Sequence, residues 1–384
     1  MSLPNLSEKT PLSRRMLPFD GLRGLAALGV AGFHLNPVSP YLFWAWTLVD
    51  LFFVLSGFLI GSILYKGFKD NSLNLKSFWM RRILRIWPVY YLTLFTVLAM
   101  SFLHGSGAVH IIGHAIRSLF FLQFTGAYLH PGADWNGVLK TFIPFFGHSW
   151  SIATEEQFYL LLPIFLWLVG IRARSIFLLV IAALVISEAL LYGGFVPGLL
   201  GTRMQGLALG LLLVPLSRWL AADQEHPASR RHYALVIIAV GAVAGLWIMV
   251  PGFLHVAPLL YSGQAVPPDL ARAFSLDSVM GMSLIYFGIV GSVLAYPSSA
   301  LARVLSLPPV VYLGSISYAL YMFHVPVEAA LMMLRGGRPP AQDTIWVQLA
   351  FWIIAIGLAH LSKVMIEDRF NALKDRYPVY NRKN

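Results

Sequence analysis

Long apolar runs constrain this chain more than any other feature. Runs of about 20 mostly apolar residues recur along it, and each could cross the roughly 30 Å hydrocarbon core of a bilayer as a helix. The hydrocarbon core offers no hydrogen-bond partners to backbone N–H and C=O groups, so such runs fold as helices, in which these groups pair with each other. A membrane β-barrel would instead show short alternating segments, which are absent from the sequence. The sequence therefore predicts an all-α, polytopic integral membrane protein.

Eleven apolar segments can be marked, and one of them differs from the rest. In residues 109–125, His110, His114 and Arg117 recur at helical spacing and form a polar stripe. If this segment does not cross, most of the 28 basic residues fall on one side of the membrane, in line with the positive-inside rule. We therefore predict about ten transmembrane helices, one extra interfacial or re-entrant helix at 109–125, and both termini in the cytoplasm. The predicted spans are 19–37, 44–65, 84–103, 149–170, 175–194, 199–217, 233–251, 278–296, 308–331 and 344–366.

The remaining sequence fits around a single membrane domain. Residues 1–18 are expected to form a cytoplasmic N-terminal segment, 19–368 the membrane domain and 369–384 a cytoplasmic tail. Residues 252–277, rich in proline and glycine, predict an outer loop. The net charge of +11 lies mainly in the connections between spans, which favours a topology signal over nucleic-acid binding. Cysteine is absent, which excludes a thiolate nucleophile and a Cys-based metal site, and no metal is expected.

The first span carries ionisable groups that are costly inside a membrane. Its stretch FDGLRGLAALGVAGFHL contains Asp20, Arg23 and His34. The eleven-residue spacing from Arg23 to His34 is close to three helical turns, so both side chains project from one face, roughly 16 Å apart along the axis. Small residues between them, such as Gly24 and Ala27, either allow close packing of another helix or leave room for a thin, extended ligand.

Further polar groups in the spans separate by depth. Arg82 and Arg85 lie at the cytoplasmic end of the third span, where a basic cluster is either a topology signal or a site for a phosphate-bearing ligand. Glu155 is placed in the outer half together with His34. A histidine paired with a carboxylate supplies a base and its orienting partner. Candidates for contacts to the substrate are Asp50, Ser151, Arg203 and His324.

Five motifs, in order, resemble those of acyltransferase family 3, a family of membrane O-acyltransferases. They are FDGLRGLAALGVAGFH, DLFFVLSGFLIG, RRILRIWPVYYL, HSWSIATEEQFYLLLP and YLGSISYALYMFH, and the similarity runs from about Leu17 to Asp368. The resemblance implies about ten membrane helices and transfer of an acetyl or other short acyl group from cytoplasmic acetyl-CoA to glycan hydroxyl groups outside. It places the family's motif residues on Arg23, His34, Arg82, Arg85, Trp150, Ser151 and Glu155.

The sequence departs from the family pattern in two places. Gln205 stands where relatives often carry an acidic residue. Larger relatives add an outer SGNH esterase-like domain, and no residues are expected to build one here. The resemblance then implies that the acyl group passes directly to the acceptor or through a separate outer-side acyl-handling protein.

The expected mechanism joins these residues in one path. Arg23, Arg82 and Arg85 bind the phosphates of acetyl-CoA, whose pantetheine arm runs along the small-residue face of the first span. His34, oriented by Glu155, acts as general base on the acceptor hydroxyl or carries the acetyl group transiently. The resemblance implies an acceptor such as lipopolysaccharide, exopolysaccharide or another glycan, reached from a bacterial cytoplasmic (inner) membrane and its lipids. A transporter or flippase of a glycan or anionic solute, without acyl transfer, is the alternative class.

Overall fold

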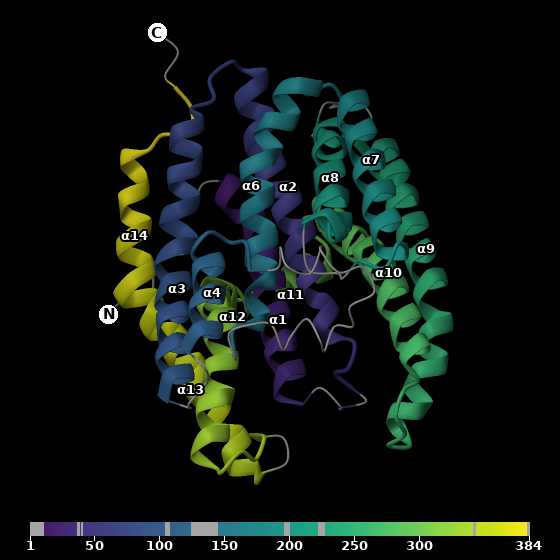
Figure 1. Cartoon of the computed structure of the whole chain (residues 1–384). Coiled ribbons are helices and arrows are strands. Elements are labelled where there is room, and N and C mark those ends of the chain that lie inside the picture. The colour runs from purple at the N-terminus through teal and green to yellow at the C-terminus, as the bar shows by residue number, and fades with distance from the viewer. Residues whose placement is uncertain are drawn as a thin grey trace.

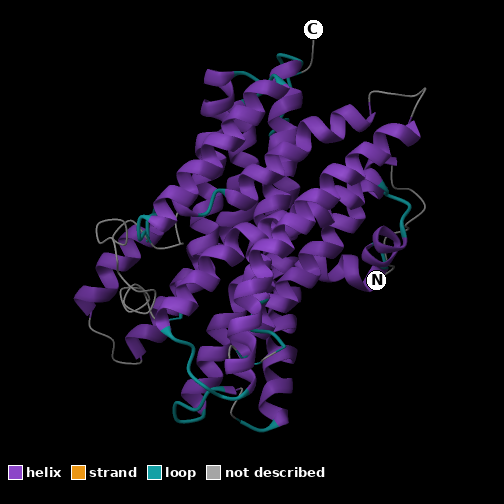
Figure 2. Cartoon of the chain, turned by 90° about the vertical axis from the view of Figure 1, so that its right-hand side faces the viewer, coloured by secondary structure: helices purple, strands orange, loops and turns teal. Residues whose placement is uncertain are grey.

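The protein is a bundle of long helices. The computed structural model describes residues 11–36, 39, 41–103, 108–123, 145–195, 200–221, 227–340 and 343–381. Within these ranges, regular structure is helical apart from an isolated β-bridge between Leu73 and Tyr380. Figure 1 shows α9 and α10 on one flank of the bundle and α13 with α14 on the other, and Figure 2 shows the loops that join the helices.

Each predicted span corresponds to one long helix. Eight helices in the described ranges are long and apolar enough to cross a membrane, and α1 and the 17-residue α8 occupy the other two predicted segments. The prediction of an all-α polytopic membrane protein is therefore confirmed. The helices are α1 Pro11–Leu35, α2 Leu48–Lys69, α3 Leu75–Leu103, α6 Trp150–Val169, α7 Ala173–Tyr192, α8 Gln205–Ala221, α9 Pro227–Tyr261, α10 Pro268–Ala295, α12 Pro308–Leu334 and α13 Ile345–Ser362.

The segment at 109–125 forms a short helix, α4 Ala108–Leu119, and its last two residues lie outside the described ranges. Twelve residues rise only about 18 Å, less than the roughly 30 Å hydrocarbon core. The end of α4 is held on α3, because the hydroxyl groups of Tyr90 and Tyr91 donate to the carbonyl oxygens of Ser118 and Leu119 at 2.8 and 2.9 Å. This length fits the predicted interfacial or re-entrant helix.

The predicted outer loop at 252–277 is wrong. α9 continues through Pro251 and Pro258 to Tyr261, and α10 begins at Pro268, so only residues 262–267 connect the two helices. Proline suits the first position of a helix, where its missing N–H would have no helical partner. Membrane helices also tolerate proline in their interior, because neighbouring groups satisfy the backbone that it frees. The loop was predicted from the proline content of these residues, but they form parts of two helices and the short turn between them.

Among the described residues there are also two short α-helices, a π-helical turn and four single-turn 3-10 helices. The two short α-helices are α11 Ala300–Leu305 and α14 Asp368–Ala372, and the π-helical residues Lys363–Glu367 lie between α13 and α14.

The centre of the bundle is the contact between α1 and α12. A Cβ added to Gly314 of α12 would overlap the carbonyl oxygen of Asp20, and one added to Gly24 would press on the backbone of Gly314. The two backbones therefore touch, as small residues permit in membrane helices. Ala27 and Val30, further along α1, are fully buried. Of the two alternatives for the small-residue face, close packing is the one that the structure shows, so the predicted pantetheine path along this face is wrong.

Candidate active site

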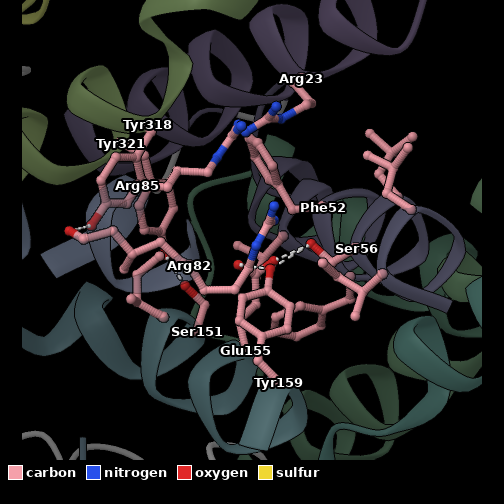
Figure 3. A pocket seen from close by; sticks show the side chains of 17 residues that line it. Arg23, Phe52, Ser56, Arg82, Arg85, Ser151, Glu155, Tyr159, Tyr318 and Tyr321 are labelled. Carbon is pink, nitrogen blue, oxygen red and sulfur yellow. Dashed lines mark hydrogen bonds between the residues drawn. The ribbon is translucent and has the colours of Figure 1, made fainter. Parts of the chain in front are cut away.

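A cavity of about 100 Å³ collects charged groups from the centre of the bundle. Arg23 of α1, Arg82 and Arg85 of α3 and Glu155 of α6 line it, and Figure 3 shows the three arginine side chains reaching into the same space. The cavity has room for several water molecules. The structure thus brings together arginines from two motifs that lie far apart in the sequence.

Positive charge exceeds negative charge among the groups that line this cavity. Three guanidinium groups share it with the single carboxylate of Glu155. Arg23 reaches another carboxylate, Asp20, only at 3.9 Å. Among the described residues, Arg82 and Arg85 have no carboxylate partner within 4.0 Å, and Nε of Arg82 is buried without a hydrogen-bond acceptor. Buried guanidinium groups require acceptors, so the cavity is suited to an anion with several oxygen atoms, such as a phosphate.

Hydroxyl groups hold both carboxylate oxygens of Glu155. Ser56 Oγ donates to Oε1 at 2.6 Å, and Tyr159 Oη donates to Oε2 at 3.0 Å. His34 has no hydrogen bond to Glu155 and instead contacts His324. The predicted orientation of His34 by Glu155 is therefore wrong. Glu155 follows Ser151 by about one turn on the same face of α6 and lines the cavity with Arg23, whose position on α1 is about three turns from that of His34.

Three histidines from separate elements lie together at the other end of α1. His34 of α1 and His324 of α12 have ring centroids 4.8 Å apart, and His148, in the turn Gly147–Ser149 before α6, lies 5.2 Å from His324. Nδ1 of His34 and Nε2 of His324 are 3.2 Å apart. Sequence reasoning gave His148 no role, because it precedes the span and belongs to no helical pattern. The described residues contain no group of three or more His, Asp or Glu side chains arranged to hold a metal ion.

Tyr321 of α12 joins the cavity to the histidines. Its ring lines the cavity, and its hydroxyl group accepts from Ser151 Oγ at 2.7 Å and donates to the carbonyl oxygen of His148 at 2.8 Å. Its own carbonyl oxygen accepts from Nδ1 of His324 at 2.6 Å. Tyr321 therefore contacts both the arginine-lined cavity and the histidine cluster, and Ser151 is bonded to it. No signal in the sequence marks Tyr321, because tyrosine is common in membrane helices near the interfaces.

Asp50 and Arg203 form an ion pair in the protein interior. Nη2 of Arg203 lies 2.8 Å from Oδ2 of Asp50, and each side chain is 1% exposed. The guanidinium group also lies 4.9 Å from the ring centroid of Trp150 and 5.7 Å from that of Trp46. This pair ties α2 to the segment that leads into α8. The structure therefore places these two of the four predicted substrate contacts among protein groups and outside the cavity lining. His324, a third, is fully buried in the histidine cluster and also lies outside that lining.

Gln205 has a carboxylate partner on the neighbouring helix. Its Nε2 donates to Oε1 of Glu188 on α7 at 2.9 Å. Relatives often carry an acidic residue at the position of Gln205. Here the neighbouring helix α7 supplies a carboxylate, that of Glu188, next to this position.

Comparisons with known proteins agree on one family. The family model described as "Acyltransferase domain" matches residues 18–362. The "Putative peptidoglycan O-acetyltransferase YrhL" of Bacillus subtilis is 30% identical over 383 residues, covering 94% of this chain and 55% of its own. The "Peptidoglycan O-acetyltransferase OatA" of Listeria monocytogenes is 29% identical over 349 residues, covering 84% and 51%. The chain spans about half the length of the curated relatives it matches. No solved structure matches it.

Proposed function

This chain belongs to acyltransferase family 3, and from that premise we propose that it is a membrane O-acetyltransferase. It takes an acetyl group from acetyl-CoA and transfers it to a glycan hydroxyl group. The names of its relatives make peptidoglycan the first acceptor to test. The observation that carries the proposal is that one helix, α1, contributes Arg23 to the cationic cavity and His34 to the histidine cluster.

Arg23, Arg82 and Arg85 bind the phosphates of acetyl-CoA. Their guanidinium groups form the excess positive charge of the cavity, and Arg82 offers a buried donor that has no protein acceptor. Hydrogen bonds between charged groups of this kind contribute about 1.5–3 kcal/mol each. Glu155, held by Ser56 and Tyr159, offsets part of the cationic charge when no donor is bound.

His34 carries the chemistry. Because the face between α1 and α12 is closed by packing, the acyl arm of the donor passes instead beside α2 and α6, where Phe52 and Tyr321 line the cavity. Their rings lie 6.1 Å apart, and the ring of Tyr321 also lies 5.7 Å from that of His148 and 5.6 Å from that of His324. The ring of Tyr321 therefore moves when the thioester reaches His34. His34 then accepts the proton of the acceptor hydroxyl group as the oxygen attacks the thioester carbonyl carbon.

The direction of transfer follows from the charge distribution. With both termini in the cytoplasm, the arginine cavity lies nearer than His34 to the side that supplies acetyl-CoA, and His34 lies toward the outer side of a bacterial inner membrane. The basic residues concentrated in the connections on one side support this orientation. The whole CoA molecule then stays on its own side while the acetyl group crosses.

The experiment that tests the function uses purified protein in liposomes. Acetyl-CoA carrying a heavy-isotope acetyl group is supplied with peptidoglycan fragments, and mass spectrometry measures the label that mild alkali releases from the glycan. We expect ester-linked label that depends on both the protein and acetyl-CoA. Movement of the glycan across the membrane without attached label would contradict the proposal and support a transporter.

A further inference from the structure

The backbone determines where the protons lie in the histidine cluster. A carbonyl oxygen only accepts hydrogen bonds, so a ring nitrogen bonded to one carries a proton. Nδ1 of His324 is bonded to the carbonyl oxygen of Tyr321 at 2.6 Å, and Nδ1 of His34 to that of Val30 at 3.0 Å. The remaining nitrogen of each neutral ring is then an acceptor. The single Nδ1–H of His34 is therefore shared between the carbonyl oxygen of Val30 at 3.0 Å and the Nε2 acceptor of His324 at 3.2 Å.

We propose that His324 is a positioning residue that, together with the carbonyl oxygen of Val30, holds His34 in the tautomer with an unprotonated Nε2, and that this Nε2 is the reacting atom. The inference rests on the proposed function and deepens it. In serine-protease triads, a carboxylate holds the catalytic histidine through its Nδ1–H. Here the neutral imidazole of His324 occupies the place that Glu155 was expected to fill.

Burial distinguishes His34 from the other two histidines. His324 is fully buried and His148 is 5% exposed, whereas His34 is only partly buried. His148 donates from Nε2 to the carbonyl oxygen of Met322 at 3.1 Å, and its ring packs against that of His324. His148 therefore packs on the ring of His324 while its own ring is held by the backbone of α12. Of the three rings, that of His34 is the one that a substrate can reach.

The transfer step balances with these two histidines alone. Nε2 of His34 takes the proton of the acceptor hydroxyl group while the hydroxyl oxygen forms a bond to the thioester carbonyl carbon. The carbon–sulfur bond then breaks, the CoA thiolate leaves, and Nε2 returns the proton to the sulfur. While His34 carries the positive charge, its Nδ1–H donates to Nε2 of His324 and the imidazolium is stabilised.

Two substitutions of His324 separate this role from simple packing. Glutamine can place its side-chain oxygen near the position of the histidine Nε2 and so keeps an acceptor for His34. Asparagine can place its amide nitrogen near Nδ1, which keeps the bond to Tyr321 but leaves the Nδ1–H of His34 with the carbonyl oxygen of Val30 as its one remaining acceptor among the described residues. We expect His324→Asn to lower kcat at least about 100-fold with the KM for acetyl-CoA within about twofold, and His324→Gln to stay within about tenfold of the original kcat.

The His324 variants test the positioning role of His324, and a separate variant of His34 tests the proposed function. Normal kcat in His324→Asn would overturn it, and so would equal loss in both variants together with a lower melting temperature. His34→Ala, measured beside them, tests the function itself. If His34→Ala transfers acetyl normally, the proposed function of His34 fails. If His34→Ala is inactive and His324→Asn is normal, only the role of His324 fails.

Discussion

The charge of the cavity depends on very few residues. Glu155 is the one carboxylate among the described side chains that line it, and it faces Arg23, Arg82 and Arg85. Burial of charged groups is costly unless they are paired. The three arginines therefore form a site that is incomplete without an anion, and two substitutions test this at the level of single side chains.

Arg82→Gln combined with Arg85→Gln is expected to weaken CoA binding at least about 100-fold, because two charge-assisted contacts of about 1.5–3 kcal/mol each are lost. Isothermal titration measures the affinity. Arg81→Gln is the matched control, since Arg81 donates to the carbonyl oxygens of Lys374 and Tyr377 at 2.7 and 3.3 Å and does not line the cavity. A similar loss in all these variants, or none in the double variant, would contradict the assignment.

Glu155→Gln is expected to tighten CoA binding about tenfold, which corresponds to about 1.4 kcal/mol. The substitution keeps an acceptor for Ser56 and removes the negative charge that repels the phosphates. Glu156→Gln serves as the control, because Glu156 accepts from Trp87 at 3.4 Å and lies outside the cavity lining; we expect a smaller change there. Weaker binding in Glu155→Gln, measured by titration at low ionic strength, would count against this role.

At the scale of elements, the contact between α1 and α12 positions both ends of the site. α1 carries Arg23 and His34, and α12 carries Tyr321 and His324. The two helices touch at Gly314, where an added Cβ would overlap the backbone of α1. Any separation of these helices therefore alters the distance between His34 and His324.

Gly314→Ala is expected to lower both the melting temperature and the transfer rate, because α1 has to move away from α12 to admit the methyl group. The destabilisation is expected to be about 1–3 kcal/mol. Gly357→Ala in α13 is the control, since nothing lies within 4 Å of its added Cβ, and alanine stabilises a helix interior by roughly 0.5–1 kcal/mol relative to glycine. Equal melting temperatures and rates in the two variants would show that the contact is not tight.

Predictions that depend on the residues of one segment succeeded, and predictions that depend on how helices pack against one another did not. The helices at the ten spans followed from apolar length, which each segment carries in its own residues. The gathering of Arg23 with Arg82 and Arg85 was also foreseen, because the predicted topology puts all three on the cytoplasmic side of the membrane. The partner of His34 was not foreseen, since the depth at which α6 places Glu155 relative to α1 depends on packing between helices. The bond to His324 likewise depends on how α1 meets α12.

At the scale of the whole molecule, the cysteine-free chain allows a direct test of topology. Cysteine introduced at Gln264 or Arg338 is expected to react with an impermeant thiol reagent in intact cells, and cysteine at Ala173 or Asn381 is expected to stay unlabelled. Gln264 and Arg338 lie beside glycines with positive φ and so avoid backbone strain. Permeabilised cells, in which all four positions should react, provide the control. The reverse pattern would place the arginine cavity on the wrong side for acetyl-CoA.

The measurement that tests the central claim most directly is acetyl transfer by His34→Ala in liposomes, with CoA binding measured on the same protein. Because His34 is assigned to proton transfer and the arginines to the donor, the variant is expected to bind CoA normally and to transfer acetyl to peptidoglycan fragments at least about 100-fold more slowly. Transfer at the rate of the unmodified protein, with normal CoA binding, would contradict the assignment of His34 as the reacting residue.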